Sequence, residues 1–219
     1  MTQAVPFRVR PAAVGRDRAL LAGGALAGPL FAASALVQGL TRDGFDFRRH
    51  PVSVLSNGDL GWVQITTFLA SGLLVLGAAA ALGRRDTGAR WLPRLLVLYG
   101  IGLVLAGIFR ADPADGFPAG TPSGPGQISW HGGLHFLAAA IGFVALIVAA
   151  LGAARRAARR GERGWAAYSL ASGVCFAAAW VALIVRPAPP TMVGFGLAVA
   201  IGWAWVTGML WRADHGRSV

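Results

Sequence analysis

The sequence predicts an all-α, polytopic membrane protein, a bundle of six transmembrane helices with both termini in the cytoplasm. Two features of composition support this fold class. Hydrophobic residues make up 55% of the 219 residues and charged residues only 13%, about half the charged fraction of a soluble domain. The apolar residues are also gathered into six runs, each near the length of about 20 residues that crosses a bilayer as a helix.

The six predicted spans cover residues 19–40, 61–82, 92–109, 129–152, 165–185 and 190–211. Their apolar cores contain no acidic residue and no arginine; Arg94 lies near the start of the third run. Because lipid offers no hydrogen-bond partner to the backbone, such runs must be helical. The pair Gly24 and Gly28 would allow close helix contact in the first span.

The chain divides into a basic N-terminal segment (1–18), a six-span domain (19–212) and a short tail (213–219). Fifteen arginines lie in the two termini and in the second and fourth connections, and five lie on the other side. The acidic residues divide into four and five, so the first side carries the whole formal charge of +11. The positive-inside rule makes that side cytoplasmic, with the protein in the plasma (inner) membrane. An open alternative is that Arg16 and Arg18, followed by Ala32-Ala33-Ser34-Ala35, form a cleaved signal peptide.

Three further expectations come from composition. The lack of lysine and the abundance of alanine and glycine are typical of a bacterial genome rich in G and C. The high pI would suit nucleic-acid binding, but the placement of the arginines indicates a topology signal and contact with anionic membrane lipids, with no nucleic acid as partner. The single cysteine, Cys175, lies in an apolar run and is expected to be a buried thiol.

Polar residues that can do chemistry gather at the outward-facing ends of the spans. His50 and Ser53 precede the second span, Asp112 follows the third, and His131 and His135 open the fourth. All five therefore project to the same membrane face, where residues distant in sequence can share one pocket. His131 and His135 are four residues apart, which places both imidazoles on one face of a helix.

Three imidazoles with a carboxylate or a water suit a zinc ion. On this hypothesis His131, His135 and His50 are the ligands, and Asp112 is a ligand, an orienting group or a general base. Ser53 would donate a hydrogen bond to a developing oxyanion. Two alternatives stay open: the histidines are structural groups that bond neighbouring helices or water, or they serve as a proton relay or ligand contact.

Several motifs resemble an uncharacterised bacterial and archaeal membrane family, domain of unknown function 998. The motifs are Gly44-Phe45-Asp46, Ser53-Val54-Leu55-Ser56 with Gly58 and Gly61-Trp62, Gly107-Ile108-Phe109-Arg110-Ala111-Asp112, and Ser129-Trp130-His131 with Leu134-His135. The resemblance covers nearly the whole chain and implies the same six-span layout. It implies no particular activity.

A looser similarity is to the alkaline ceramidases and progestin/adipoQ receptors, in which zinc is held by three histidines with an aspartate and a serine close by. Ser129-Trp130-His131 to His135 is similar to their Ser-His-x-x-x-His element. In that superfamily the paired histidines lie in a seventh span, whereas here they open the fourth, and Trp130 separates the serine from the histidine.

Two hypotheses follow. The first is a zinc-dependent membrane hydrolase of a lipid amide or ester, with an outward-facing polar pocket. The second is a non-enzymatic transporter, small-ligand receptor or assembly partner. Both would bind a lipid-like or small-molecule ligand on the extracytoplasmic side. The polar residues cluster at one membrane face and the two halves show no clear repeat, which disfavours transport.

Overall fold

The computed structural model describes residues 11–85, 89–124 and 126–217, and in them it contains helices and no strand. Six helices are long and apolar enough to cross a membrane, as the sequence predicts. They are α1 (Pro11–Thr41), α2 (Gly61–Arg84), α3 (Trp91–Ile108), α4 (Trp130–Arg159), α5 (Arg163–Val185) and α6 (Pro189–Asp214), with a short 3₁₀ helix η1 (Val52–Ser56) between α1 and α2.

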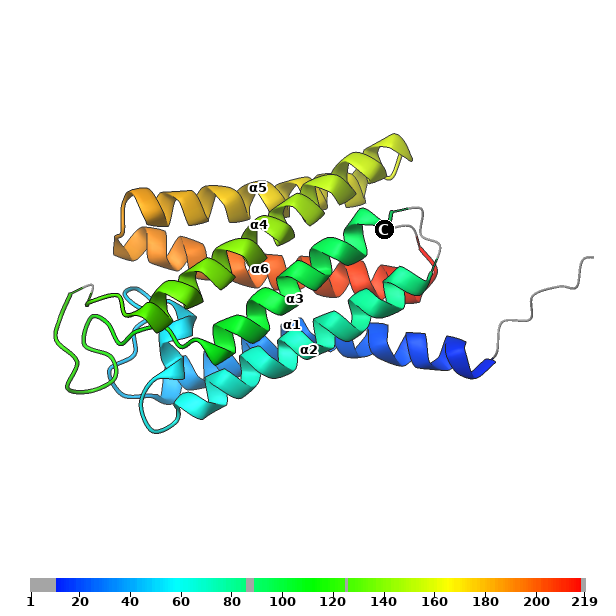
Figure 1. The fold of residues 1–219 in the computed structure, drawn as a ribbon. Helices are drawn as coiled ribbons and strands as arrows, with labels where there is room; N and C mark the ends of the chain where they lie inside the picture. The colour runs from blue at the N-terminus through cyan, green and yellow to red at the C-terminus, as the bar shows by residue number, and fades with distance from the viewer. Residues whose placement is uncertain (1–10, 86–88, 125, 218–219) are drawn as a thin grey trace, which may run out of the picture.

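The helices form a closed ring in chain order. Each helix packs against its neighbours in sequence, and α1 packs against α6 to complete the circle. The two long loops lie at one end of the bundle, and the first and last described residues lie at the other (Figure 1). Three residues separate α4 from α5 and α5 from α6, and connections this short favour antiparallel neighbours.

Aromatic side chains fill the inside of the ring. Phe31 of α1 contacts Phe68 of α2 and Trp203 of α6, with ring centroids 5.4 and 5.2 Å apart, and Trp203 also contacts Tyr99 of α3 at 5.4 Å. All four side chains are less than 7% exposed. They join α1, α2, α3 and α6 in one core. The spacing of apolar residues within one helix does not predict these contacts between helices.

Glycines on α1 allow the close helix contact that the sequence suggests. A Cβ added at Gly24 would lie 2.4 Å from the Cβ of Ala78 on α2, and one at Gly28 would lie 2.6 Å from Thr207 Oγ1 on α6. Both distances are far below van der Waals contact, so a larger residue would force α1 away from its neighbours.

Some helices are longer than the apolar runs that predict them. α1 begins at Pro11, so residues 11–18 of the basic segment are helical, and α4 continues to Arg159, seven residues past the predicted span. Alanine and arginine favour helix as strongly as leucine does, so a helix need not end where its hydrophobic run ends.

The prediction that Cys175 is buried is wrong, because its side chain is exposed on α5. α5 has the smallest buried share of the six spans, and an apolar sequence by itself does not separate side chains that face lipid from those that face protein.

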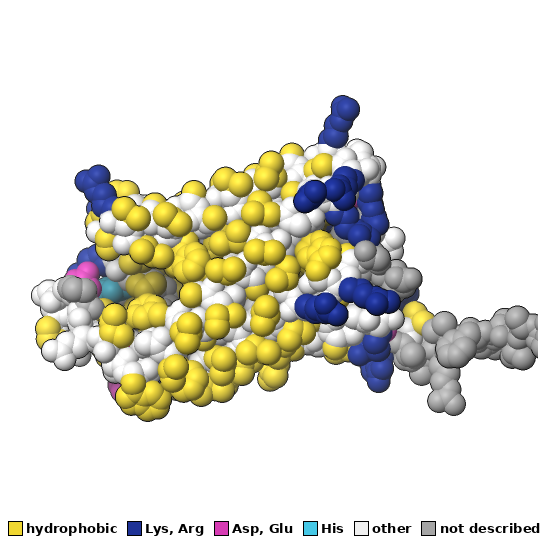
Figure 2. Space-filling model, turned by 45° about the horizontal axis from the view of Figure 1, so that its top comes forward, with side chains coloured by type: hydrophobic (Ala, Val, Ile, Leu, Met, Phe, Trp, Pro, Cys, Tyr) yellow, Lys and Arg dark blue, Asp and Glu magenta, His cyan; other side chains and the backbone are white. Residues whose placement is uncertain are grey.

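The arginines gather at the end of the bundle opposite the long loops (Figure 2). On the face that Figure 2 shows, apolar side chains cover the surface between the two ends. This distribution is the one that the positive-inside rule uses, and the cytoplasmic location of the basic end stays a prediction.

Candidate functional site

The predicted site residues lie at the loop end of the bundle, in and under a cap built from residues 42–60 and 109–124 (Figure 1). The cap has a small core of its own, separate from that of the ring. Its buried residues are Val54, Leu55, Ala111 and Phe117. Two loops that are far apart in sequence thus fold as one unit.

His50 ties the two loops of the cap together. The backbone N–H of Asp46 donates to His50 Nδ1 at 3.0 Å, so the ring proton lies on Nε2, which donates to the carbonyl oxygen of Asp115 at 3.0 Å. The ring is 2% exposed and packs between Phe45 and Phe117. Both nitrogens have backbone partners, so neither has a lone pair left for a metal ion.

Arg42 and Asn57 add further ties within the cap. The Arg42 guanidinium donates to the carbonyl oxygens of Leu55 and Asn57 and lies 4.8 Å from the centroid of the Phe117 ring. Asn57 Nδ2 donates to the carbonyl oxygen of Ala111 at 2.9 Å. Burial in the cap lowers the pKa of Arg42, while the charge of Asp59 acts in the opposite direction.

Asp112 forms part of the N-terminal cap of α4. Its carboxylate accepts from the Ser129 backbone N–H at 2.7 Å and from Ser129 Oγ at 2.6 Å, and Ser129 Oγ in turn accepts from Gly132 N–H at 3.2 Å. The Asp112 side chain thus links the end of α3 to the start of α4, and Ser129 Oγ satisfies a helix N–H that lacks an intrahelical partner.

His135 bonds the C-terminal end of α3, whereas Asp112 bonds the N-terminal end of α4. Its Nδ1 lies 3.0 Å from the carbonyl oxygen of Ala106 and 2.9 Å from that of Phe109. Since both partners are acceptors, Nδ1 carries the proton and donates to the end of α3. The side chain is 3% exposed, and its ring lies 6.0 Å from that of Phe68.

The structure does not bring the predicted ligands together. His131 is partly exposed and its ring contacts Trp130, while Ser53 lies in η1, where its carbonyl oxygen accepts from Ser56 Oγ. Across residues 11–85, 89–124 and 126–217, no group of three or more His, Cys, Asp or Glu side chains could hold a metal ion. His50, His131 and His135 therefore do not fit the three-histidine zinc site of the first hypothesis in this conformation.

A second polar cluster lies below the cap, between α1 and α2. Gln38 Nε2 donates to Gln64 Oε1 at 2.9 Å and to Ser34 Oγ at 3.1 Å, and Ser34 Oγ lies 2.7 Å from Thr67 Oγ1. Gln38 is 5% exposed and Gln64 is fully buried. Gln38 Oε1 and Gln64 Nε2 have no hydrogen-bond partner in the described part of the chain.

A family model described as "Protein of unknown function (DUF998)" matches residues 25–212. The chain belongs to this family. No curated protein matches the chain, and no solved structure does. The looser similarity to the alkaline ceramidase superfamily has no counterpart among these findings.

Sequence reasoning missed two buried polar residues of this DUF998 protein, Gln38 and Gln64. Gln38 and Gln64 each lie inside a predicted span, but a search for charged side chains passes over them. An uncharged amide within an apolar run is the signal that would have found them. From the sequence, Arg42 is only a charged loop residue and Asn57 only part of an Asn-Gly turn. Contacts of both residues with the loop 109–124 form only in the folded cap.

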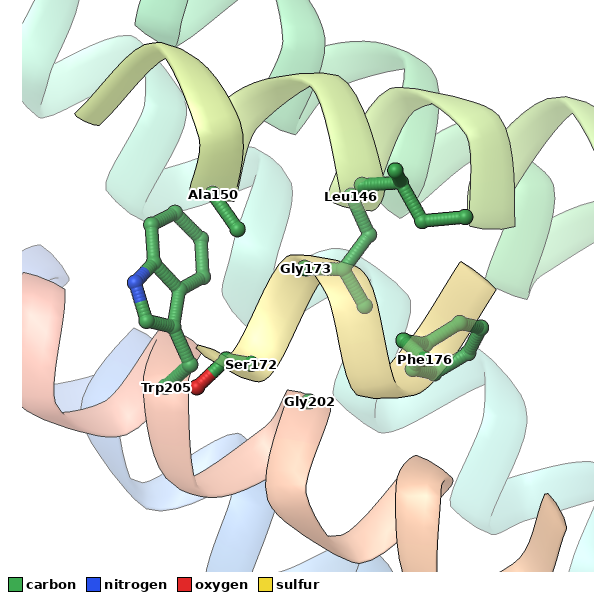
Figure 3. A pocket seen from close by; sticks show the side chains of 8 residues that line it. Leu146, Ala150, Ser172, Gly173, Phe176, Gly202 and Trp205 are labelled. Atoms are coloured by element: carbon green, nitrogen blue, oxygen red, sulfur yellow. The ribbon is translucent and has the colours of Figure 1, made fainter. Parts of the chain in front are cut away.

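One crevice in this DUF998 protein lies between α4, α5 and α6, and Figure 3 shows its lining. It is lined mainly by apolar residues, including Leu146, Phe176 and Trp205, and has no room for a water molecule. The hydroxyl of Ser172 donates to the carbonyl oxygen of Tyr168. The crevice is a small gap in the packing between the three helices.

Proposed function

We propose that this integral membrane protein is a non-enzymatic binding protein for a neutral, lipid-like ligand, which enters between α1 and α2 below the cap. The observation that carries the proposal is the buried amide pair. Gln38 and Gln64 bond each other, yet one carbonyl oxygen and one amide nitrogen have no partner.

A 180° flip of the two side-chain amides does not satisfy these unpaired groups. If both side-chain amides are flipped, Gln64 becomes the donor and Gln38 the acceptor, and one acceptor and one donor are again left over. Each unsatisfied buried group costs about 1–3 kcal/mol, and the bilayer cannot supply the missing partner. A ligand hydroxyl both donates and accepts, so it offers the two kinds of hydrogen bond that these groups lack.

The chemistry of the cluster favours a neutral ligand. Its side chains, Ser34, Gln38, Gln64 and Thr67, are uncharged, so nothing in the cluster neutralises an ion in low dielectric. The groups that a hydrolase would need are bonded elsewhere, since His50 and the Nδ1 of His135 bind backbone carbonyls. These contacts support binding over catalysis.

The proposed site is closed in this structure, because neither amide is more than 5% exposed. Entry therefore requires α1 and α2 to part. At the same level of α1, the apolar side chains Leu36, Val37 and Leu40 are more than half exposed, so this stretch of the helix faces lipid, in which an apolar ligand dissolves.

The experiment measures binding of 1-oleoylglycerol to the detergent-purified protein by native mass spectrometry, with oleate as a charged comparison. We expect one bound 1-oleoylglycerol, weak binding of oleate, and about a 10- to 30-fold weaker affinity in the double variant Gln38→Leu/Gln64→Leu, from the loss of about two hydrogen bonds. Gln127→Leu, in the exposed loop before α4, is the matched control.

The melting temperature of the double variant distinguishes a ligand-binding role of the two amides from a purely structural one. Replacing both partners with apolar side chains of similar size is near neutral or stabilising when the pair is not needed for folding. We therefore expect the double variant to keep or raise the melting temperature while it loses the ligand. Unchanged 1-oleoylglycerol binding, or binding that Gln127→Leu weakens equally, would overturn the proposal.

A further inference from the structure

A group of exposed arginines lies where α3 begins and α4 ends. This is the end of the bundle at which Figure 2 shows arginines gathered. Its members are Arg90 and Arg94 on the α3 side and Arg155 and Arg159 on α4. The topology signal explains why arginines lie at this end of the protein, but it does not explain why four of them share one seam between two helices.

Helix packing and spacing bring the two pairs together. α3 packs directly against α4, and a Cβ added at Gly152 would lie 2.7 Å from the Trp91 ring. Arg94 is one turn from Trp91, and Arg155 and Arg159 follow Gly152 at spacings of three and seven, so they share the face of α4 that meets α3. The guanidiniums therefore flank the point where Trp91 packs on Gly152.

Two acidic residues at this end pair with arginines outside the seam. Asp17 forms a salt bridge with Arg84 at 2.6 Å, and Glu162 forms one with Arg212. Among the residues that the structure describes, no ion pair joins an acidic side chain to any of the four seam arginines. Within the described residues, the seam thus carries four positive charges with no acidic side chain paired to them.

An apolar track leads from the arginines toward the middle of the membrane. On α3, Leu98 and Ile101 continue the face of Arg94, and they are 43% and 42% exposed. On α4, Val148 continues the face of Gly152 and is 47% exposed. Cationic groups at the membrane edge above exposed apolar side chains match a phospholipid, whose phosphate lies at the edge and whose acyl chains lie below it.

We propose that the α3–α4 seam binds an anionic phospholipid that carries two phosphates, one for each pair of arginines. Guanidinium groups bind phosphate oxygens in bidentate fashion, and two pairs on facing helices match two phosphodiesters better than one. The exposed tracks on α3 and α4 contact the acyl chains. This site is at the opposite end of the bundle from the amide cluster and does not depend on it.

The test uses the full-length protein in detergent and native mass spectrometry with three probes: tetraoleoyl cardiolipin, dioleoylphosphatidylglycerol and inorganic pyrophosphate. We expect cardiolipin to bind most tightly and pyrophosphate, which lacks acyl chains, not to bind. The variant Arg90→Gln/Arg94→Gln is expected to weaken cardiolipin binding about 10- to 30-fold.

The matched control is Arg110→Gln/Arg186→Gln, which removes the same charge from exposed positions at the loop end. It is expected to leave cardiolipin binding within about twofold of the native value. If both variants weakened cardiolipin binding equally, the effect would come from net charge alone, and the proposal would be overturned. Equal affinity for both phospholipids would overturn the two-phosphate assignment, and binding of pyrophosphate would assign the site to free phosphates.

Discussion

Replacement of Gly132 by alanine tests the junction between α3 and α4. A Cβ at this position would lie 2.0 Å from Asp112 Oδ2, whereas ordinary contact begins at 3.4 Å. The carboxylate would have to move by more than 1 Å, away from the Ser129 donors that it accepts from at 2.6 and 2.7 Å. The variant Gly132→Ala therefore strains or breaks the link between the two helices.

The expected cost is that of overpacking, about 1–3 kcal/mol. In a protein of this size 1 kcal/mol shifts the melting temperature by about 2–4 °C, so we expect a decrease of about 2–12 °C. The assay is thermal unfolding in detergent followed by tryptophan fluorescence. Gly133→Ala is the matched control, because nothing lies within 4 Å of a Cβ there; it should be neutral or slightly stabilising, since alanine favours helix over glycine.

The Asp112→Ala variant separates the clash from other effects of the added methyl group. In Asp112→Ala the carboxylate is gone, so a Cβ at Gly132 no longer meets it. Adding Gly132→Ala to that variant should raise stability by up to about 1 kcal/mol. The effect of Gly132→Ala on stability thus changes from a loss to a gain when the Asp112 carboxylate is removed. A loss of similar size in both backgrounds would refute the reasoning, because the clash with Asp112 would then not be its cause.

Three further predictions concern the cap and the ring. His50→Ala removes two hydrogen bonds and a buried ring and should destabilise the protein by about 3–5 kcal/mol, measured by thermal unfolding; a loss below 1 kcal/mol would show that the loops hold together without it. Gly28→Val should lower the melting temperature and the yield of monodisperse protein by forcing α1 from Thr207, while Gly196→Val, with nothing within 4 Å, should not; equal effects would contradict the packing argument. The Arg48 backbone N–H, helped by the charge of Arg49, lowers the pKa of Asp46. Asp46 therefore stabilises the cap above the ordinary aspartate pKa of about 3.9, and this stability is lost as pH falls through the lower folded pKa. The difference in melting temperature between the native protein and Asp46→Asn should vanish in acid, and a difference that persists at about pH 2 would refute it.

The site shows which inferences a linear pattern supports and which it does not. The position of His131 and His135 at the start of an apolar run correctly predicts that both lie at the start of the fourth span. It does not predict that His135 donates to the last carbonyls of α3, because that contact depends on how two helices pack. Asp112 is similar: its position at the end of the third span is clear from the sequence, but its bonds to Ser129 arise only when the loop closes.

The sequence by itself determined the six spans, their order and the concentration of arginine in alternate connections. Burial of a helix in lipid depends on local hydrophobicity and on backbone hydrogen bonds within one segment, so a linear chain carries that information. Only the tertiary structure decided that His50 joins two loops, that Gln38 meets Gln64 and that four arginines share a seam. Those facts depend on the positions of residues 26 or more apart in sequence, and distances of this kind are fixed by packing around the ring.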